Sequence, residues 1–208
     1  MSHRVDPGFG GERALGDKCA LPSSLYTGVR YKPLLTGGMA LLAGGAMPLA
    51  FAPVGWAWLA VIALATFFVL TAQSSRRQAL WSAYLFGLGY FGVGVSWVFI
   101  SISQYGNGPV VAVLVTAAFV SLLALFPWGV AYLVRCLRPE MDAMALWLGL
   151  PAAWVLSEWM RTWFLTGFPW LFIGYSQTDT TLATIAPVFG VLGVSLLVAL
   201  LAGGLAWI

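Results

Sequence analysis

The sequence predicts an all-α protein, a polytopic transmembrane helix bundle of about six spans with its N-terminus in the cytoplasm. Hydrophobic residues make up 61% of the chain and charged residues only 8%, whereas soluble domains are about 45–50% apolar and about 25% charged. The apolar residues form long blocks, not one stripe per helix. Each block is close to the roughly 20 residues that a helix needs to cross a bilayer.

A polar, basic tail at residues 1–33 precedes a transmembrane domain at residues 34–208. The expected spans are residues 34–53, 55–72, 79–101, 109–134, 143–163 and 186–208. Gly167 and Pro169 interrupt the helical pattern after the fifth span, since proline lacks the backbone donor that a helix interior needs. Residues 164–185 are therefore expected to form an interfacial segment on the outer leaflet.

The first two spans differ in composition. Residues 34–53 contain four glycines and end near Pro48 and Pro53, which lowers the helix propensity and favours a kink or a tilt. Trp56 and Trp58 begin the second span, as is typical of aromatic anchors at the membrane interface.

The third span contains a G-x-G-x-x-G pattern at residues 87–92. Dinucleotide binding would require a preceding strand and a soluble α/β unit, but these glycines stand inside an apolar helix. Small residues in such a helix let its neighbours approach closely, so the pattern predicts helix packing. The polar loop expected next, Ser101–Gly108, is either an interfacial turn or a contact site for a substrate head group.

The distribution of basic residues indicates the orientation. They precede the first span or lie in alternate loops, at Arg4, Arg13, Lys18, Arg30, Lys32, Arg76, Arg77, Arg135 and Arg138. Arg161, at the end of the fifth span, is the exception. Because cytoplasmic loops carry an excess of Lys and Arg, residues 164–185 are expected to face outward. The net charge of +3 reflects this topology and does not indicate nucleic-acid binding.

Ser157, Glu158 and Arg161 are the strongest functional signal in the chain. Residues three or four apart share one face of a helix, so Glu158 and Arg161 are expected to pair. A charged side chain at the bilayer centre costs roughly 2.5–3.5 kcal/mol on insertion scales, so such residues usually pair or serve a function. Two interpretations stay open: an ion pair that braces the bundle, and a polar cavity for a lipid or cofactor head group.

The groups needed for common catalytic sites are missing. The single histidine, His3, and both lysines precede the first span, which excludes Ser–His and Cys–His nucleophile pairs within the membrane domain. Cys19 and Cys136 are expected on the cytoplasmic side, where a disulfide is not favoured, and neither has metal-ligand spacing. No catalytic residue, metal or cofactor is therefore assigned.

Several strings, in this order, resemble one family. They are Leu49–Pro53, residues 87–98 with Ser101-Ile102, Glu158–Arg161, Thr166–Trp170, Gly174–Gln177, and Leu182-Ala183 through Pro187, Gly190 and Gly193-Val194. From about residue 34 to the end, the chain resembles the N-terminal membrane region of bacterial apolipoprotein N-acyltransferase. The resemblance implies a multi-pass acyltransferase of the bacterial inner membrane. That enzyme transfers an acyl chain from a phospholipid to the N-terminal diacylglyceryl-cysteine of apolipoproteins.

In that family, the resemblance further implies, a periplasmic nitrilase-like domain with a Glu-Lys-Cys triad carries out the reaction. The sequence stops at Ile208, before such a domain, so this polypeptide alone is expected to be an inactive fragment. The implied partners are a phospholipid acyl donor, a diacylglyceryl apolipoprotein acceptor and membrane lipids.

The role expected for this region is to position lipid substrates, which lowers the entropic cost of the reaction. The lipid-facing candidates are Glu158, Arg161, Trp163, Thr166, Trp170, Tyr175 and Gln177, of which Arg161 would contact a phosphate. The alternative is a non-enzymatic membrane scaffold or half of a transporter. Gly- and Pro-interrupted spans favour a transporter, but the two halves of the chain show no repeat.

Overall fold

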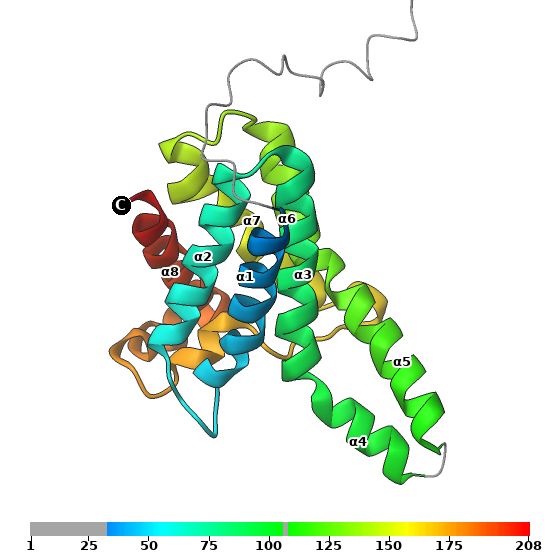
Figure 1. The fold of residues 1–208 in the computed structure, drawn as a ribbon. Coiled ribbons are helices and arrows are strands. Elements are labelled where there is room, and N and C mark those ends of the chain that lie inside the picture. The colour runs from blue at the N-terminus through cyan, green and yellow to red at the C-terminus, as the bar shows by residue number, and fades with distance from the viewer. Residues whose placement is uncertain (1–32, 106–107) are drawn as a thin grey trace, which may run out of the picture.

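The computed structural model describes residues 33–105 and 108–208, and every regular element within these ranges is helical (Figure 1). The α-helices are α1 (Pro33–Ala46), α2 (Trp58–Gln73), α3 (Arg76–Gly94), α4 (Ser96–Gln104), α5 (Gly108–Leu123), α6 (Leu125–Leu137), α7 (Leu150–Arg161) and α8 (Ala186–Trp207). The shorter helices are η2 (Met47–Ala50), η3 (Ala145–Gly149), η4 (Phe164–Thr166), η5 (Ile173–Gln177) and η6 (Thr181–Ile185). The predicted all-α class is confirmed. The predicted tail lies outside the described residues, apart from Pro33.

Three helical stretches in the described ranges are long and apolar enough to cross a membrane: Pro33–Ala50, Gly108–Leu137 and Thr181–Trp207. The pair α3–α4 makes a fourth if its two helices form one bent span. Helix α2 is apolar but shorter, and the predicted fifth span is divided between a π-helical turn, η3, and α7. The structure therefore has three or four candidate spans, and the number six stays a prediction.

Glycines set the close packing of α3. A Cβ atom at Gly89 would lie 2.3 Å from the carbonyl oxygen of Leu41 on α1, and one at Gly44 would lie 2.0 Å from the carbonyl oxygen of Phe86. A Cβ at Gly87 would lie 2.7 Å from the Cα of Ala124, between α5 and α6. The interpretation as a packing motif is confirmed at Gly87 and Gly89, whereas a Cβ at Gly92 would meet only the Val120 side chain, at 4.0 Å.

The predicted span at residues 79–101 corresponds to two helices, α3 and α4, and its crossing of the membrane stays a prediction. The chain bends by 49° between α3 and α4, and α4 and α5 extend from the bundle as a helical hairpin (Figure 1). The predicted loop at 101–108 also begins too early. Helix α4 runs to Gln104 because the backbone N–H of Tyr105 bonds back to the carbonyl of Ser101, at 3.2 Å.

The segment 164–185 contains three short 3₁₀ helices, η4, η5 and η6, joined by turns. It lies at the same end of the bundle as the connection from α1 to α2 (Figure 1), and the Gln177 side chain donates to the Ala57 carbonyl there, at 3.1 Å. Gly167 ends η4 and makes the turn that follows it possible. Its φ is +90°, and a Cβ would lie 2.4 Å from the carbonyl oxygen of Thr162.

Candidate functional site

Helix α7 carries both charged residues of the candidate site. Pro151 stands in its first turn, directly after the π-helical turn η3. Trp154, Glu158 and Arg161 follow at spacings of four and three residues and so share one face. That face points into the bundle: Glu158 is 0% exposed and Arg161 is 2% exposed.

Trp154 packs this face against aromatic side chains of α2 and α3. Its ring meets Phe67 edge-on at 5.6 Å between centroids and Phe86 at 6.2 Å. Aromatic pairs prefer such edge-to-face arrangements. The indole N–H is then directed at Glu158, so the packing of Trp154 also sets the position of the carboxylate.

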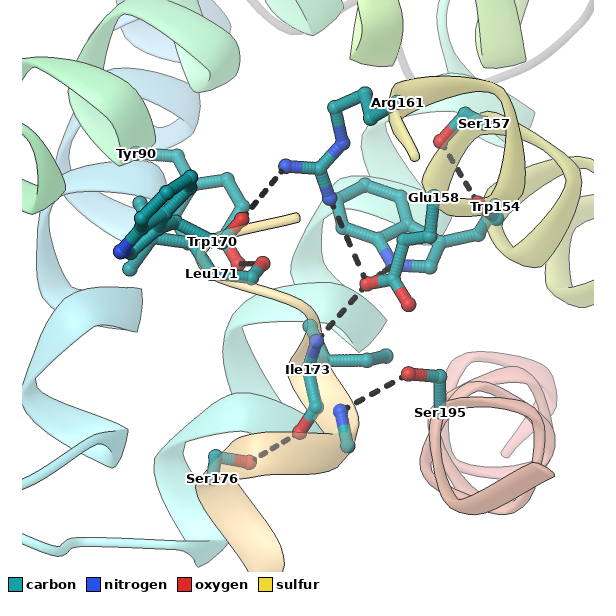
Figure 2. Close-up of polar contacts among 11 residues, drawn as sticks. Tyr90, Trp154, Ser157, Glu158, Arg161, Trp170, Leu171, Ile173, Ser176 and Ser195 are labelled. Carbon is teal, nitrogen blue, oxygen red and sulfur yellow. Dashed lines mark hydrogen bonds and ion pairs between the residues drawn. The ribbon is translucent and has the colours of Figure 1, made fainter. Parts of the chain in front are cut away.

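One oxygen of the Glu158 carboxylate joins three partners (Figure 2). Oε1 accepts from the indole N–H of Trp154 at 3.0 Å and from the backbone N–H of Ile173 at 2.9 Å. It also lies 3.8 Å from the guanidinium of Arg161, so the predicted pairing is confirmed. Ile173 is the first residue of η5, and its N–H has no partner within that helix. The Glu158 carboxylate on α7 provides the acceptor that this N–H lacks.

Arg161 is enclosed by aromatic rings. Its guanidinium carbon lies 4.9 Å from the ring centroid of Phe172, 5.3 Å from that of Phe91 and 5.9 Å from that of Phe126. These separations fit cation–π attraction, which strengthens when the cation is desolvated. The guanidinium also donates to the carbonyl of Trp170, at 3.1 Å. The contacts of the Arg161 guanidinium described here are therefore with aromatic rings, a backbone carbonyl and the Glu158 carboxylate.

Other side chains fix the backbone from residue 170 to residue 174. The Tyr90 hydroxyl donates to the carbonyl of Leu171, and the Ser195 hydroxyl accepts from the N–H of Gly174 at 3.0 Å. Leu171 has φ +58°, a conformation uncommon for residues other than glycine. The bonds to Tyr90, Arg161, Glu158 and Ser195 hold the chain in this shape (Figure 2).

The described ranges include neither histidine nor lysine, and no cluster of three or more His, Cys, Asp or Glu within them is placed to hold a metal. Glu158 Oε2 and Arg161 Nε are buried without a hydrogen-bond partner in the same ranges. The charges therefore depend on each other, because burying an ionised group without its partner is strongly unfavourable.

Comparison with known proteins gives the family. Residues 43–204 match the family described as the apolipoprotein N-acyltransferase N-terminal domain. The chain belongs to this family. An apolipoprotein N-acyltransferase of Methylococcus capsulatus is 49% identical over 183 residues, which cover 82% of this chain and 34% of the relative. Those of Coxiella burnetii and Vibrio parahaemolyticus are 43% and 39% identical, over 79% and 81% of this chain and 34% of each relative. The chain spans about a third of the length of these curated relatives.

Within this apolipoprotein N-acyltransferase N-terminal domain, the seven sequence-predicted candidates divide into two sets. Glu158, Arg161 and Gln177 are buried, and the polar contacts described for them are with other groups of the protein. The other four are exposed: Trp163, Thr166, Trp170 and Tyr175. Glu158 and Arg161 hydrogen-bond to the backbone of the segment that carries Trp170 and Tyr175. Trp170 provides the carbonyl that Arg161 binds, and the Tyr175 ring stacks on Phe172 at 6.0 Å.

Sequence reasoning misplaced one residue and missed others. Ser157 is only partly buried, unlike Glu158 and Arg161, and its hydroxyl donates to the Trp154 carbonyl at 2.7 Å. Ser195 and Tyr90 were missed, although both belong to the network. A lone hydroxyl inside the apolar block 186–208 was the available signal for Ser195. Tyr90 had none, since its partner lies 81 residues away.

Proposed function

We propose that this chain is the membrane portion of an apolipoprotein N-acyltransferase. Such an enzyme moves an acyl chain from a phospholipid donor to the N-terminal diacylglyceryl-cysteine of an apolipoprotein acceptor. The family match over residues 43–204 is the observation that supports this most directly. The part proposed for the present residues is to hold lipid substrates in position, since no side chain of this chain is assigned to bond making or breaking.

The buried network suggests how the positioning works. Glu158 caps η5 at Ile173, and Arg161 holds the carbonyl of Trp170. The exposed Trp170 and Tyr175 side chains are thereby attached to a rigid support. We propose that these two residues, with Trp163 and Thr166, form the rim that lipid substrates touch. Glu158, Arg161 and Gln177 act through that support.

The proposed setting is the bacterial inner membrane. The chain crosses it about six times with the N-terminus in the cytoplasm, so that residues 164–185 lie at the outer surface. The asymmetry of Lys and Arg supports this orientation. Exposed tryptophans at the end of the bundle that bears this segment, Trp56, Trp58 and Trp170, fit an interfacial belt.

A chimera tests the function. Residues 43–204 of this chain replace the matching residues of the Methylococcus capsulatus relative, and N-acylation of a diacylglyceryl lipopeptide is followed by mass spectrometry in phosphatidylethanolamine vesicles. The chimera is expected to acylate the lipopeptide. A folded, membrane-inserted chimera without activity would contradict the proposal. The unfused 208-residue chain is expected to give no product.

The rim is tested in the same chimera. Trp170→Ala and Tyr175→Ala are each expected to raise the KM for the phospholipid severalfold, because each removes apolar contact area from the rim. Trp81→Ala is the matched control. Trp81 is about as exposed as Trp170, but it lies near the N-terminal end of α3 and outside the proposed rim. If all three variants change KM equally, the rim assignment is wrong.

A further inference from the structure

An apolar groove lies between α6 and α7, and the Phe126 ring separates it from Arg161. Its walls include Leu125, Gly129 and Leu133 of α6, Leu156 and Met160 of α7, and Phe164 of η4. The groove has a volume of about 280 Å³. From Leu125 to Leu133 it follows about 12 Å of helix, at 1.5 Å per residue.

Gly129 leaves the space that makes the groove. A Cβ built at this position meets no atom within 4 Å, whereas Cβ atoms at Gly87 and Gly89 would clash with neighbouring helices. The glycine is therefore not required for helix packing. Because Gly129 has no side chain, it leaves open space between the longer side chains of Leu125 and Leu133.

The groove offers its occupant almost no polar group. Ser157 is the one hydroxyl-bearing residue in its lining, and its hydrogen already goes to the Trp154 carbonyl, at 2.7 Å. At one end the Phe126 and Phe164 rings meet edge-on at 6.0 Å. Phe126 also lies against the Arg161 guanidinium, so this ring separates the buried charge from the groove. A charged or strongly hydrogen-bonding ligand would gain nothing here.

The position of the groove identifies the material available to fill it. Helices α5 and α6 form the 30-residue candidate span Gly108–Leu137, so a groove along α6 lies at the depth of the hydrocarbon. An unfilled groove forfeits dispersion contacts on one side of its lining. A cavity of about 150 Å³ with a Leu, Ile and Phe lining takes up benzene, so the volume here suits a chain segment of roughly ten carbons.

We propose that the groove between α6 and α7 binds one acyl chain of a membrane phospholipid. The chain lies along α6 over Gly129, with its head-group end toward Phe164 and the neighbouring Trp163. This inference rests on membrane insertion and on the groove, and does not require that the protein transfers acyl groups. Occupancy and acyl transfer are therefore measured separately.

The test uses the full 208-residue chain in vesicles of phosphatidylethanolamine and phosphatidylglycerol. A small fraction of the phosphatidylethanolamine carries a photoreactive diazirine on one acyl chain, and labelled peptides are identified by mass spectrometry. Labelling is expected to concentrate on α6 and α7, relative to the exposed face of α8. Gly129→Leu fills the floor of the groove and should reduce that labelling severalfold.

Gly38→Leu is the matched control. Gly38 is an exposed helical glycine on α1, and, as at Gly129, a Cβ built there would meet no atom within 4 Å. It should leave the labelling of α6 and α7 unchanged. Leu156→Trp fills the groove from the opposite wall and should reproduce the effect of Gly129→Leu if that variant fails to fold, as judged by circular dichroism and size-exclusion profile.

Three outcomes would overturn the proposal. The first is labelling spread evenly over all lipid-facing helices. The second is labelling of α6 and α7 that persists in folded Gly129→Leu and Leu156→Trp. The third is crosslinking of the groove to another copy of the chain in place of lipid, obtained with a photoreactive residue at position 133, because a protein helix would then be the occupant.

Discussion

Two ion pairs occur in very different surroundings within residues 33–105 and 108–208. Arg161 and Glu158 are buried among aromatic rings and backbone groups, whereas Arg138 and Asp142 form an i,i+4 pair at 3.1 Å with side chains 46% and 47% exposed. A buried pair is expensive to break, because the remaining charge stays desolvated. An exposed pair exchanges its contacts for water at little cost. The same chemistry should therefore give unequal effects at the two places.

Glu158→Gln should destabilise the fold strongly. The substitution keeps the size of the side chain but leaves the Arg161 charge unpaired, at an expected cost of about 3–5 kcal/mol. Unfolding by sodium dodecyl sulfate titration in dodecylmaltoside micelles measures the change. Adding Arg161→Met should restore part of the loss, since the unpaired charge is then removed.

Asp142→Asn is the matched control for that experiment. It removes the exposed pair but retains an oxygen for the N–H of Ala145, which Asp142 accepts at 2.9 Å. The expected change is within about 1 kcal/mol. Equal effects of Asp142→Asn and Glu158→Gln would show that the burial of Glu158 has no energetic consequence.

Ser195→Ala tests the second support of η5. Without the hydroxyl, the buried N–H of Gly174 loses its acceptor, which is expected to cost about 1–3 kcal/mol. Hydrogen exchange in the peptide covering residues 173–177 should accelerate. Ser103→Ala, on the exposed helix α4, should leave that exchange unchanged, and an unchanged rate in both variants would argue against the support.

Glycine spacing decides how the helices meet. Without strong hydrophobic driving force inside a bilayer, helices associate through close packing. Helices α1 and α3 approach at Gly44 and Gly89 so closely that either Cβ would fall within 2.3 Å of a backbone carbonyl oxygen of the other helix. A backbone oxygen cannot move aside as a side chain can. These two glycines are therefore required by the contact, unlike Gly129 or Gly38.

Gly44→Ala should weaken the bundle although alanine is the better helix former. Overpacking of this kind typically costs about 1–3 kcal/mol, and the same micelle titration measures it. Gly38→Ala, where a Cβ meets nothing, should be neutral or stabilising by up to about 1 kcal/mol. A Gly44→Ala variant as stable as Gly38→Ala would mean that α1 and α3 are further apart than the structure places them.

Across the whole molecule, two basic side chains and the segment 164–185 lie at opposite ends of the bundle. Arg76 and Arg135 lie together at one end, where the Arg135 guanidinium donates to the carbonyl of Ser74. Segment 164–185 lies at the end where α1 connects to α2. Large apolar side chains are exposed on α1, α5 and α8 between these ends. This distribution suits a hydrocarbon environment around the helices.

Cysteine accessibility tests the proposed topology. In a chain with Cys19→Ser and Cys136→Ala, Thr180→Cys is expected to react with a membrane-impermeant maleimide in intact spheroplasts. Asp142→Cys is expected to react only after permeabilisation. The reason is that basic loops stay in the cytoplasm, which places residues 142 and 180 on opposite sides. Reaction of both positions from one side would contradict the orientation.

The sequence by itself determined the properties that depend on local pattern. Long apolar blocks with few charges predicted a helical membrane protein, because a chain in hydrocarbon must satisfy its backbone hydrogen bonds internally. Helical spacing predicted that Glu158 and Arg161 would pair, and the small residues at 87–92 predicted close packing. Each of these follows from residues within a few turns of one another.

Only the tertiary structure decided where the paired charges point and what supports them. Phe91, Phe126 and Phe172 reach Arg161 from three separate parts of the chain, and no spacing rule connects such distant residues. The bend between α3 and α4 and the groove beside Gly129 likewise depend on neighbouring elements. The physical reason is that burial and enclosure arise from long-range packing, whereas periodicity reports only which face of a helix is apolar.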